Sequence, residues 1–138
     1  MDKYIQLQSA DGLNDLFTTV KPELKYTNSS PTSGWGAGAE VVLGCTRTPK
    51  YLLVEVVQNP SSTNKYYETF IIIPEHLYTH TTARFDGGTN YNMERSFIYE
   101  SSTDKFRTPA ICYYGTSWNS MGGSSATFLV PTRVWAIY

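Results

Sequence analysis

Strand-like segments recur along the chain at intervals of about 12 to 15 residues from Glu40 onward. In Tyr51–Val57 every second residue from Leu52 is aliphatic, which is the period of a β-strand with one buried face. The stretch Tyr66–Ile73 follows after a turn-like segment at 59–64 and ends at a proline. These two runs predict an antiparallel pair at the centre of a sheet. A chain with this periodicity throughout is expected to be all-β.

The last eleven residues, Phe128–Tyr138, read as a further strand. If this segment frayed, Trp135, Ile137 and Tyr138 would stand in water, so we expect it to be paired into a sheet. Further strands are expected at residues 23–27, 40–45, 80–86, 91–100 and 105–114. The segment Ser9–Phe17 has the spacing of a single short helical turn.

Two of the expected strands have distinct faces. In His80–Asp86, residues 80, 82, 84 and 86 are polar or charged and alternate with Thr81, Ala83 and Phe85, which is typical of a sheet with one wet face. In Tyr91–Glu100 the aromatic face also carries Arg95, which is expected to stack on a ring or pair with a carboxylate. Together the segments predict an antiparallel β-sandwich, jelly-roll-like or an open barrel, of about seven to nine strands. The whole chain, 1–138, is expected to form one domain.

Charge and hydropathy argue against several partners. Eleven basic and twelve acidic residues give a net charge of −1 with no long run of either sign, which disfavours nucleic acid and anionic membrane surfaces. Apolar stretches such as Phe70–Ile73 are too short to cross a bilayer, and Met1–Ile5 does not resemble a signal peptide. We therefore expect a soluble, unexported chain. For the same reason Cys45 and Cys112 are expected to be two buried thiols rather than a disulfide.

Catalytic and metal motifs are weak. His76 and His80 are four residues apart, but they follow Pro74 and run into strand sequence, so a pair of solvated loop histidines is the expectation rather than a metal site. Neither cysteine has a nucleophile signature around it, and no phosphate-binding glycine motif is present. A carboxylate pair for glycoside cleavage cannot be placed from sequence. The chain is predicted to act without catalysis, cofactor or metal.

Two long glycine- and serine-rich loops each carry a tryptophan. Aromatic rings stack on the apolar faces of sugars, and small polar side chains bind their hydroxyls. The predicted ligand-binding residues are therefore Trp35, Asp86, Asn90, Tyr91, Trp118 and Asn119. The alternative is that the tryptophans only cover the ends of the core.

Three short motifs carry a family resemblance: Leu129–Ile137, the strand Lys50–Val56 and the segment Arg95–Phe97. In their order along the chain, these segments make residues 40–138 resemble the C-terminal head domains of bacteriophage tail fibres and related receptor-binding proteins. The resemblance implies a β-sandwich head, often a homotrimer, located in the virion and made in the bacterial host cytoplasm. It also implies contact with a host surface polysaccharide, teichoic acid or protein, and with other virion proteins. This chain lacks the fibrous shaft of that family, and the loop residues cannot be carried over from it.

Three functions follow from these expectations. The leading one is a non-enzymatic virion domain that recognises a host-surface glycan or other surface ligand through its apical loops and uses a flank of the sheet for self-association. The main alternative is a structural virion component, such as a head-decoration or tail-adaptor protein, that makes only protein contacts. A glycan-cleaving enzyme is the third.

Overall fold

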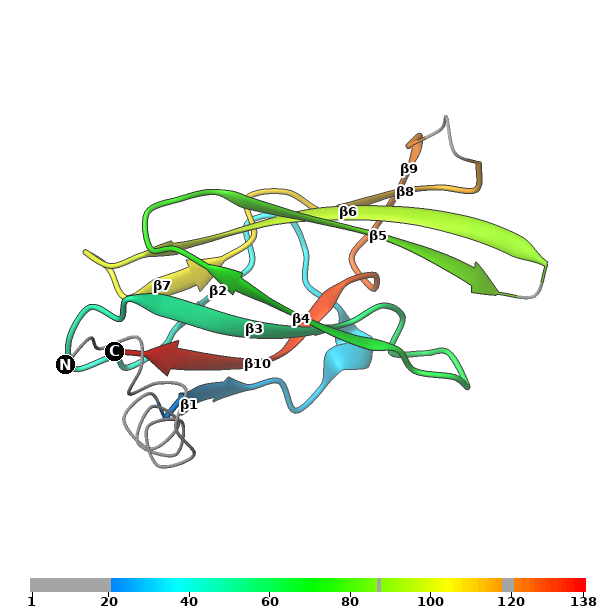
Figure 1. Ribbon diagram of the computed structural model, residues 1–138. Helices are drawn as coiled ribbons and strands as arrows, with labels where there is room; N and C mark the ends of the chain where they lie inside the picture. The colour runs from blue at the N-terminus through cyan, green and yellow to red at the C-terminus, as the bar shows by residue number, and fades with distance from the viewer. Residues whose placement is uncertain (1–20, 87, 118–120) are drawn as a thin grey trace, which may run out of the picture.

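The chain folds into two antiparallel β-sheets packed face to face, as the computed structural model in Figure 1 shows. The structure describes residues 21–86, 88–117 and 121–138, without the side chains of residues 85 and 86. The described strands are β1 (Glu23–Thr27), β2 (Glu40–Val42), β3 (Tyr51–Val57), β4 (Tyr67–Ile72), β5 (Tyr78–Asp86), β6 (Thr89–Glu100), β7 (Lys105–Arg107), β8 (Cys112–Gly115), β9 (Gly123–Ser125) and β10 (Val130–Ile137). The predicted β-sandwich is confirmed.

The described residues form ten strands, slightly more than the sequence predicted. The expected strand at 105–114 is divided into β7 and β8, because Pro109 has no N–H for a ladder and Thr108 Oγ1 binds the carbonyls of Ser96 and Ala110. The other additional strand is β9. It lies in a segment that the sequence predicted to be a loop, and it pairs with β8. A single 3₁₀ turn, η1 (Pro31–Ser33), was not predicted, and the predicted helical turn at Ser9–Phe17 lies outside the described residues.

One sheet has the order β1-β10-β3-β4. The predicted hairpin is confirmed, with Leu52 opposite Ile72 and Val54 opposite Phe70. The last strand, β10, lies between β1 and β3, so the expected pairing of the C-terminal segment is also confirmed.

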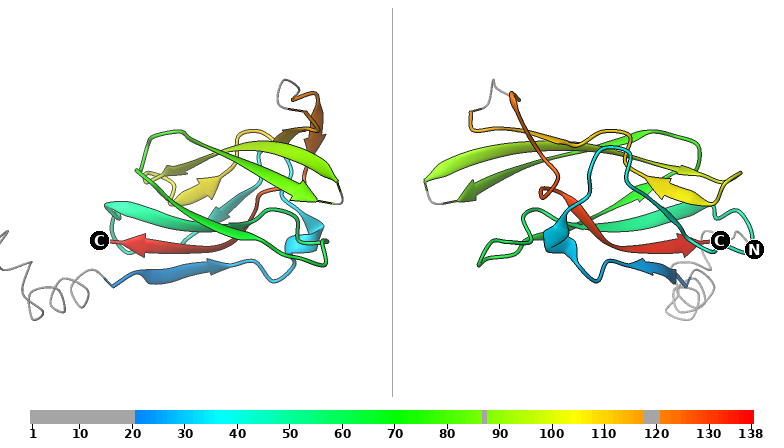
Figure 2. Two further views of the ribbon diagram at one scale, coloured as in Figure 1. Left: turned by 45° about the vertical axis from the view of Figure 1, so that its right-hand side comes forward. Right: turned by 180° about the vertical axis from the view of Figure 1, so that it is seen from behind.

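The second sheet is organised around β6, its longest strand. This strand pairs with β5 along most of its length, with β8 through Asn92–Glu94 and with β7 through Ile98–Glu100. The β5–β6 hairpin extends toward the end of the sandwich opposite to the C-terminus, as Figures 1 and 2 show. Within the described part of the chain, no helix is long and apolar enough to cross a membrane.

The core lies between the sheets and is largely aromatic and aliphatic. Phe97 of β6 is its centre: its ring lies 5.4 Å from that of Phe70 in the opposite sheet and 5.7 Å from that of Phe106. Met93, Phe97 and Tyr99 are buried on one face of β6, as the alternation predicted.

Arg95 is buried on that same face, and its environment differs from both expectations. Its Nη2 donates to the carbonyl oxygens of Trp35, at 2.7 Å, and of Ser125, at 3.3 Å. Among the described residues it has neither a ring stack nor a carboxylate partner. The carbonyl oxygen of Trp35, which lies in a loop, and that of Ser125, at the end of β9, accept from the guanidinium in place of a carboxylate.

Both cysteines are free thiols, as expected; Cys112 is fully buried, whereas Cys45 is only partly so. Burial raises the pKa of Cys112 to about 11 and also raises the pKa of Cys45.

We therefore expect a dithionitrobenzoate assay at pH 8 to label Cys45 slowly in the native protein and Cys112 not at all, because the thiolate is the reactive form. Both thiols should react at once in denaturant without reductant. In the Cys45→Ser variant, native labelling should disappear. Rapid labelling of two thiols in the folded protein, or of none after denaturation, would contradict this assignment.

Candidate recognition site

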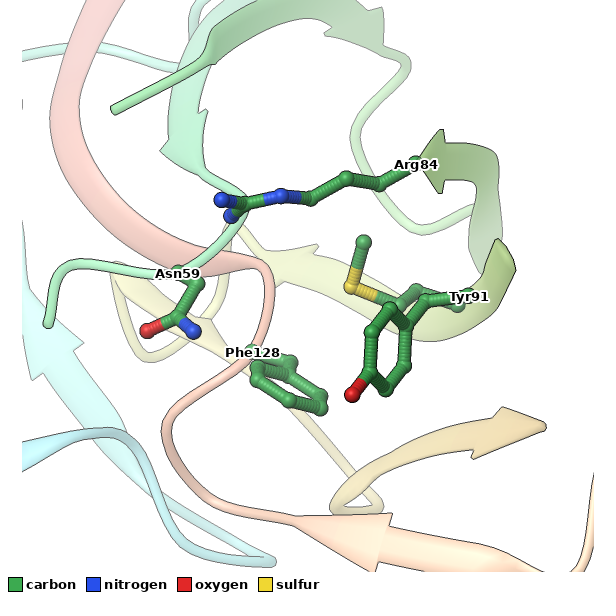
Figure 3. Close-up of a pocket in the computed structure, with 5 residues that line it drawn as sticks. Asn59, Arg84, Tyr91 and Phe128 are labelled. Carbon is green, nitrogen blue, oxygen red and sulfur yellow. The ribbon is translucent and has the colours of Figure 1, made fainter. Parts of the chain in front are cut away.

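A small pocket opens between the two sheets beneath the β5–β6 hairpin. It has a volume of about 60 Å³ and is lined by Asn59, Arg84, Tyr91, Met93 and Phe128. Figure 3 shows the Arg84 side chain reaching from β5 toward Asn59, with the rings of Tyr91 and Phe128 close to each other. The pocket therefore combines a polar wall with an aromatic one.

The hairpin register places two of these side chains together. Asp86 pairs with Thr89 across the tight turn, so Arg84 is directly opposite Tyr91 on the same face. Arg84 Nη2 donates to Ser62 Oγ at 2.5 Å and to the carbonyl oxygen of Asn64 at 3.3 Å. Both acceptors belong to the turn between β3 and β4. The arginine thus ties the hairpin of one sheet to a turn of the other.

The two aromatic rings that line the pocket pack on a third, that of Tyr114, which does not line it. The ring centroid of Tyr91 is 6.2 Å from that of Phe128 and 6.3 Å from that of Tyr114, and the latter two rings are 5.1 Å apart. Gly123 of β9 makes this possible, because a β-carbon there would lie 2.5 Å from the Tyr114 ring. The absence of a side chain at this position lets Tyr114 lie against β9.

A second cavity, of about 250 Å³, adjoins the first through Arg84 and is also lined by Gln58, Tyr66 and Ala83. The Arg84 guanidinium carbon is 5.3 Å from the centre of the Tyr66 ring. Half of the Tyr66 side chain is exposed, so this cavity presents an aromatic face to ligands in solution.

Polar side chains continue from these cavities along the inner face of β5. Thr82 Oγ1 donates to Glu68 Oε1 at 2.7 Å and accepts a hydrogen bond from Gln58 Nε2 at 3.3 Å. The polar face of β5 therefore turns toward the other sheet, whereas Thr81 and Ala83 are exposed. The wet face of this strand is the one that carries Thr81 and Ala83.

His80 belongs to this inner face, so the expectation of a solvated loop histidine is wrong for it. Its side chain is 12% exposed, its Nε2 lies 3.3 Å from Glu68 Oε2, and its ring stacks on Phe70 at 4.6 Å. His76 is exposed before β5 begins. Among the described residues no three His, Cys, Asp or Glu side chains are grouped as a metal site would require.

The ligand-binding residues predicted from sequence fall into three groups: those at the β5–β6 hairpin, those outside the described residues, and Trp35. Tyr91 lines the pocket, and Asn90 precedes it on β6. Asp86 ends β5 at the same hairpin, although its side chain is not described, and Trp118 and Asn119 lie outside the described residues.

Trp35 is in a different place. It is 7% exposed, and its ring packs 6.0 Å from Tyr26 and 5.6 Å from Phe106 in the core. The main-chain N–H of Trp35 donates to the carbonyl oxygen of Ala126 at 2.7 Å. Gly34 precedes it at a φ of +75°, and a β-carbon there would collide with the same carbonyl. This geometry favours the alternative in which Trp35 covers the core, and we do not include it in the recognition site.

Sequence reasoning missed Asn59, Arg84 and Phe128. Arg84 could have been found, because a Gly-Gly pair between two strand-like runs is a sequence signal for a two-residue hairpin loop, and that register pairs Arg84 with Tyr91. Phe128 had no such signal: it follows β9 and precedes a strand in the other sheet, so no ladder register places it.

No protein-family model matches this chain, and neither the curated proteins nor the solved structures gave a significant match. The class that the fold defines is therefore an antiparallel β-sandwich protein, and the site must be interpreted from its own chemistry.

Proposed function

We propose that this protein is a non-enzymatic recognition domain of a phage virion that binds a glycan or other ligand on the host cell surface. The observation that carries the proposal is the pocket at the β5–β6 hairpin, with Tyr91 and Phe128 on one side and Asn59 and Arg84 on the other. The motif resemblance to tail-fibre head domains supplies the biological setting, and the β-sandwich fold agrees with it.

The chemistry of the pocket suits a sugar or a similar polyol. Tyrosine and phenylalanine rings offer flat apolar surfaces at small entropic cost. An asparagine amide both donates and accepts, and a guanidinium donates to hydroxyl oxygens. A volume of about 60 Å³ admits one substituent of a larger glycan, with the rest of the ligand lying over the adjoining cavity at Tyr66.

The test is binding of fluorescently labelled protein to whole cells from a panel of Gram-positive and Gram-negative bacteria. We expect binding to at least one strain, weakened about tenfold by Tyr91→Ala and much less by Tyr91→Phe, since the ring is the larger contact. Tyr113→Ala, an exposed tyrosine on β8 that does not line the pocket, is the matched control. Absence of binding to every strain, or release of reducing sugar from the bound cells, would contradict the proposal.

A second candidate function is a structural virion component, and one observation favours it. The register of the first sheet aligns Leu24, Trp135, Leu53 and Ile71 in one row across all four strands. Leu24 and Ile71 are 51% and 52% exposed, which is unusual for side chains on the outer face of a sandwich.

We propose that further copies of the chain cover this row. A structural virion component needs such a protein contact, and the leading function would use the same contact for the trimer that the resemblance implies. Sedimentation equilibrium should then give a mass above that of one 15.5 kDa chain, and Ile71→Lys should shift it toward the monomer. A monomer at high protein concentration would exclude self-association through this face.

A further inference from the structure

A third hollow lies on the outer face of the β1-β10-β3-β4 sheet, on the side away from the core. Its volume is about 420 Å³, within the range of small-ligand sites. The side chains that define it, here called the sheet groove, are Thr27, Asn28, Glu55, Tyr67, Thr132 and Arg133. It shares no lining residue with the recognition pocket, so it is a separate site.

The groove is built on an irregularity of β10. The pairing of β10 with β3 shifts register between Pro131 and Arg133, which places Thr132 in a bulge. The two carbonyl groups at the bulge are satisfied by Asn28: its N–H donates to the oxygen of Thr132 at 2.8 Å, and its Nδ2 donates to the oxygen of Pro131 at 3.0 Å. Bulges re-aim side chains, and here the re-aimed residue is a threonine.

Thr132 holds the carboxylate of Glu55. Its Oγ1 lies 2.7 Å from Glu55 Oε1 and 3.2 Å from the main-chain oxygen of the same residue. Thr132 is buried, and the Glu55 side chain is only 18% exposed. The carboxylate is therefore fixed in direction through Oε1, and in the described part of the chain Oε2 takes part in no hydrogen bond.

Two further groups complete the groove. Arg133 is directly opposite Glu55 across the strands, and its Nε is 3.9 Å from Oε1, which is too long for a hydrogen bond and leaves its donors available. Tyr67 lies on β4, two positions from the residue that pairs with Glu55, and is 56% exposed. Diagonal neighbours of this kind are about 7 to 8 Å apart, which is the span of one sugar ring with its hydroxyls.

We propose that the sheet groove binds a neutral sugar ring. The ring stacks on Tyr67, two of its hydroxyls donate to the fixed Glu55 carboxylate, and Arg133 donates to a third oxygen. An acidic sugar is disfavoured, because its carboxylate would meet Glu55 in a partly desolvated place where Arg133 already offsets one negative charge. A single carboxylate with a threonine is also a poor cation site.

The test is ¹⁵N–¹H NMR titration with maltotriose, cellotriose and tri-N-acetylchitotriose, with trigalacturonic acid as the acidic comparison. We expect at least one neutral trisaccharide to shift the amide signals of residues 27–28, 55, 67 and 132–133, with a Kd of about 0.1 to 1 mM. The acid should bind at least about tenfold more weakly.

Two variants and one control identify the groove. Tyr67→Ala changes an exposed side chain, and Glu55→Gln keeps an acceptor for Thr132, so both should fold; each should weaken binding about tenfold. Tyr51→Ala, an exposed tyrosine on the same sheet outside the groove, should not.

The site is independent of the proposed host recognition, and the two can fail separately. Shifts confined to the β5–β6 hairpin and abolished by Tyr91→Ala would overturn the groove assignment while supporting the recognition pocket. Absence of shifts with all three neutral sugars at 20-fold the expected Kd would also overturn it.

Discussion

Replacing Phe97 by alanine is expected to lower the free energy of unfolding by about 3 to 5 kcal/mol, which is the usual cost of removing a buried phenylalanine ring. Phe97 has no exposed surface and joins the two sheets, since its ring packs on both Phe70 and Phe106. The two rings that pack on Phe97 belong to paired strands, so they cannot readily move to fill the cavity. In a domain stable by about 5 to 15 kcal/mol, this loss is a large fraction of the total.

Urea denaturation followed by tyrosine and tryptophan fluorescence measures the effect, and the melting temperature should fall by about 10 to 15 °C. Tyr113→Ala is the control, because it removes an aromatic ring of similar size that is 45% exposed on β8. It should change the stability by less than about 1 kcal/mol. Equal losses in the two variants would mean that Phe97 is not the centre of the core.

The strands that sequence predicted well are those with an uninterrupted period of two. Tyr51–Val57 appears with the predicted boundaries, and its even-numbered residues are buried as expected. Such a strand is specified by burial of one face, and that signal is local in the sequence. The sequence predicted β7 and β8 as one strand and missed β9. These strands are three or four residues long, and their boundaries depend on Pro109 and on pairing with other strands rather than on a local pattern.

The candidate site was harder to predict, for a physical reason. Its residues come from a hairpin, a turn of the opposite sheet and the segment before β10, so they meet only because two sheets pack together. A glycine-rich loop indicates an irregular path but not which way its tryptophan turns. At Trp35 the main-chain N–H donates to the carbonyl oxygen of Ala126, about ninety residues away in sequence, and the ring is buried in the core.

Arg95 carries the second large prediction. Substitution by alanine is expected to cost about 3 to 5 kcal/mol, because it removes the packing of a long buried side chain and leaves two carbonyl groups without their donor. Those carbonyls, of Trp35 and Ser125, lie in segments that close the same end of the core over β6. We therefore expect the loss to be accompanied by exposure of Trp35, visible as a red shift of tryptophan emission before global unfolding.

Methionine at the same position separates packing from hydrogen bonding. Burial lowers the pKa of Arg95 to about 10, so at neutral pH the guanidinium stays charged and its desolvation opposes folding. Methionine removes that cost and fills most of the space, but it cannot donate to either carbonyl. Arg95→Met should consequently lose only about 1 to 2 kcal/mol, less than Arg95→Ala, yet still show the red shift. If both variants unfold at the same urea concentration, the two hydrogen bonds rather than the packing account for the role of this residue. If Arg95→Met matches the parent protein in both stability and emission, the hydrogen bonds to Trp35 and Ser125 do not help to hold that end of the sandwich closed.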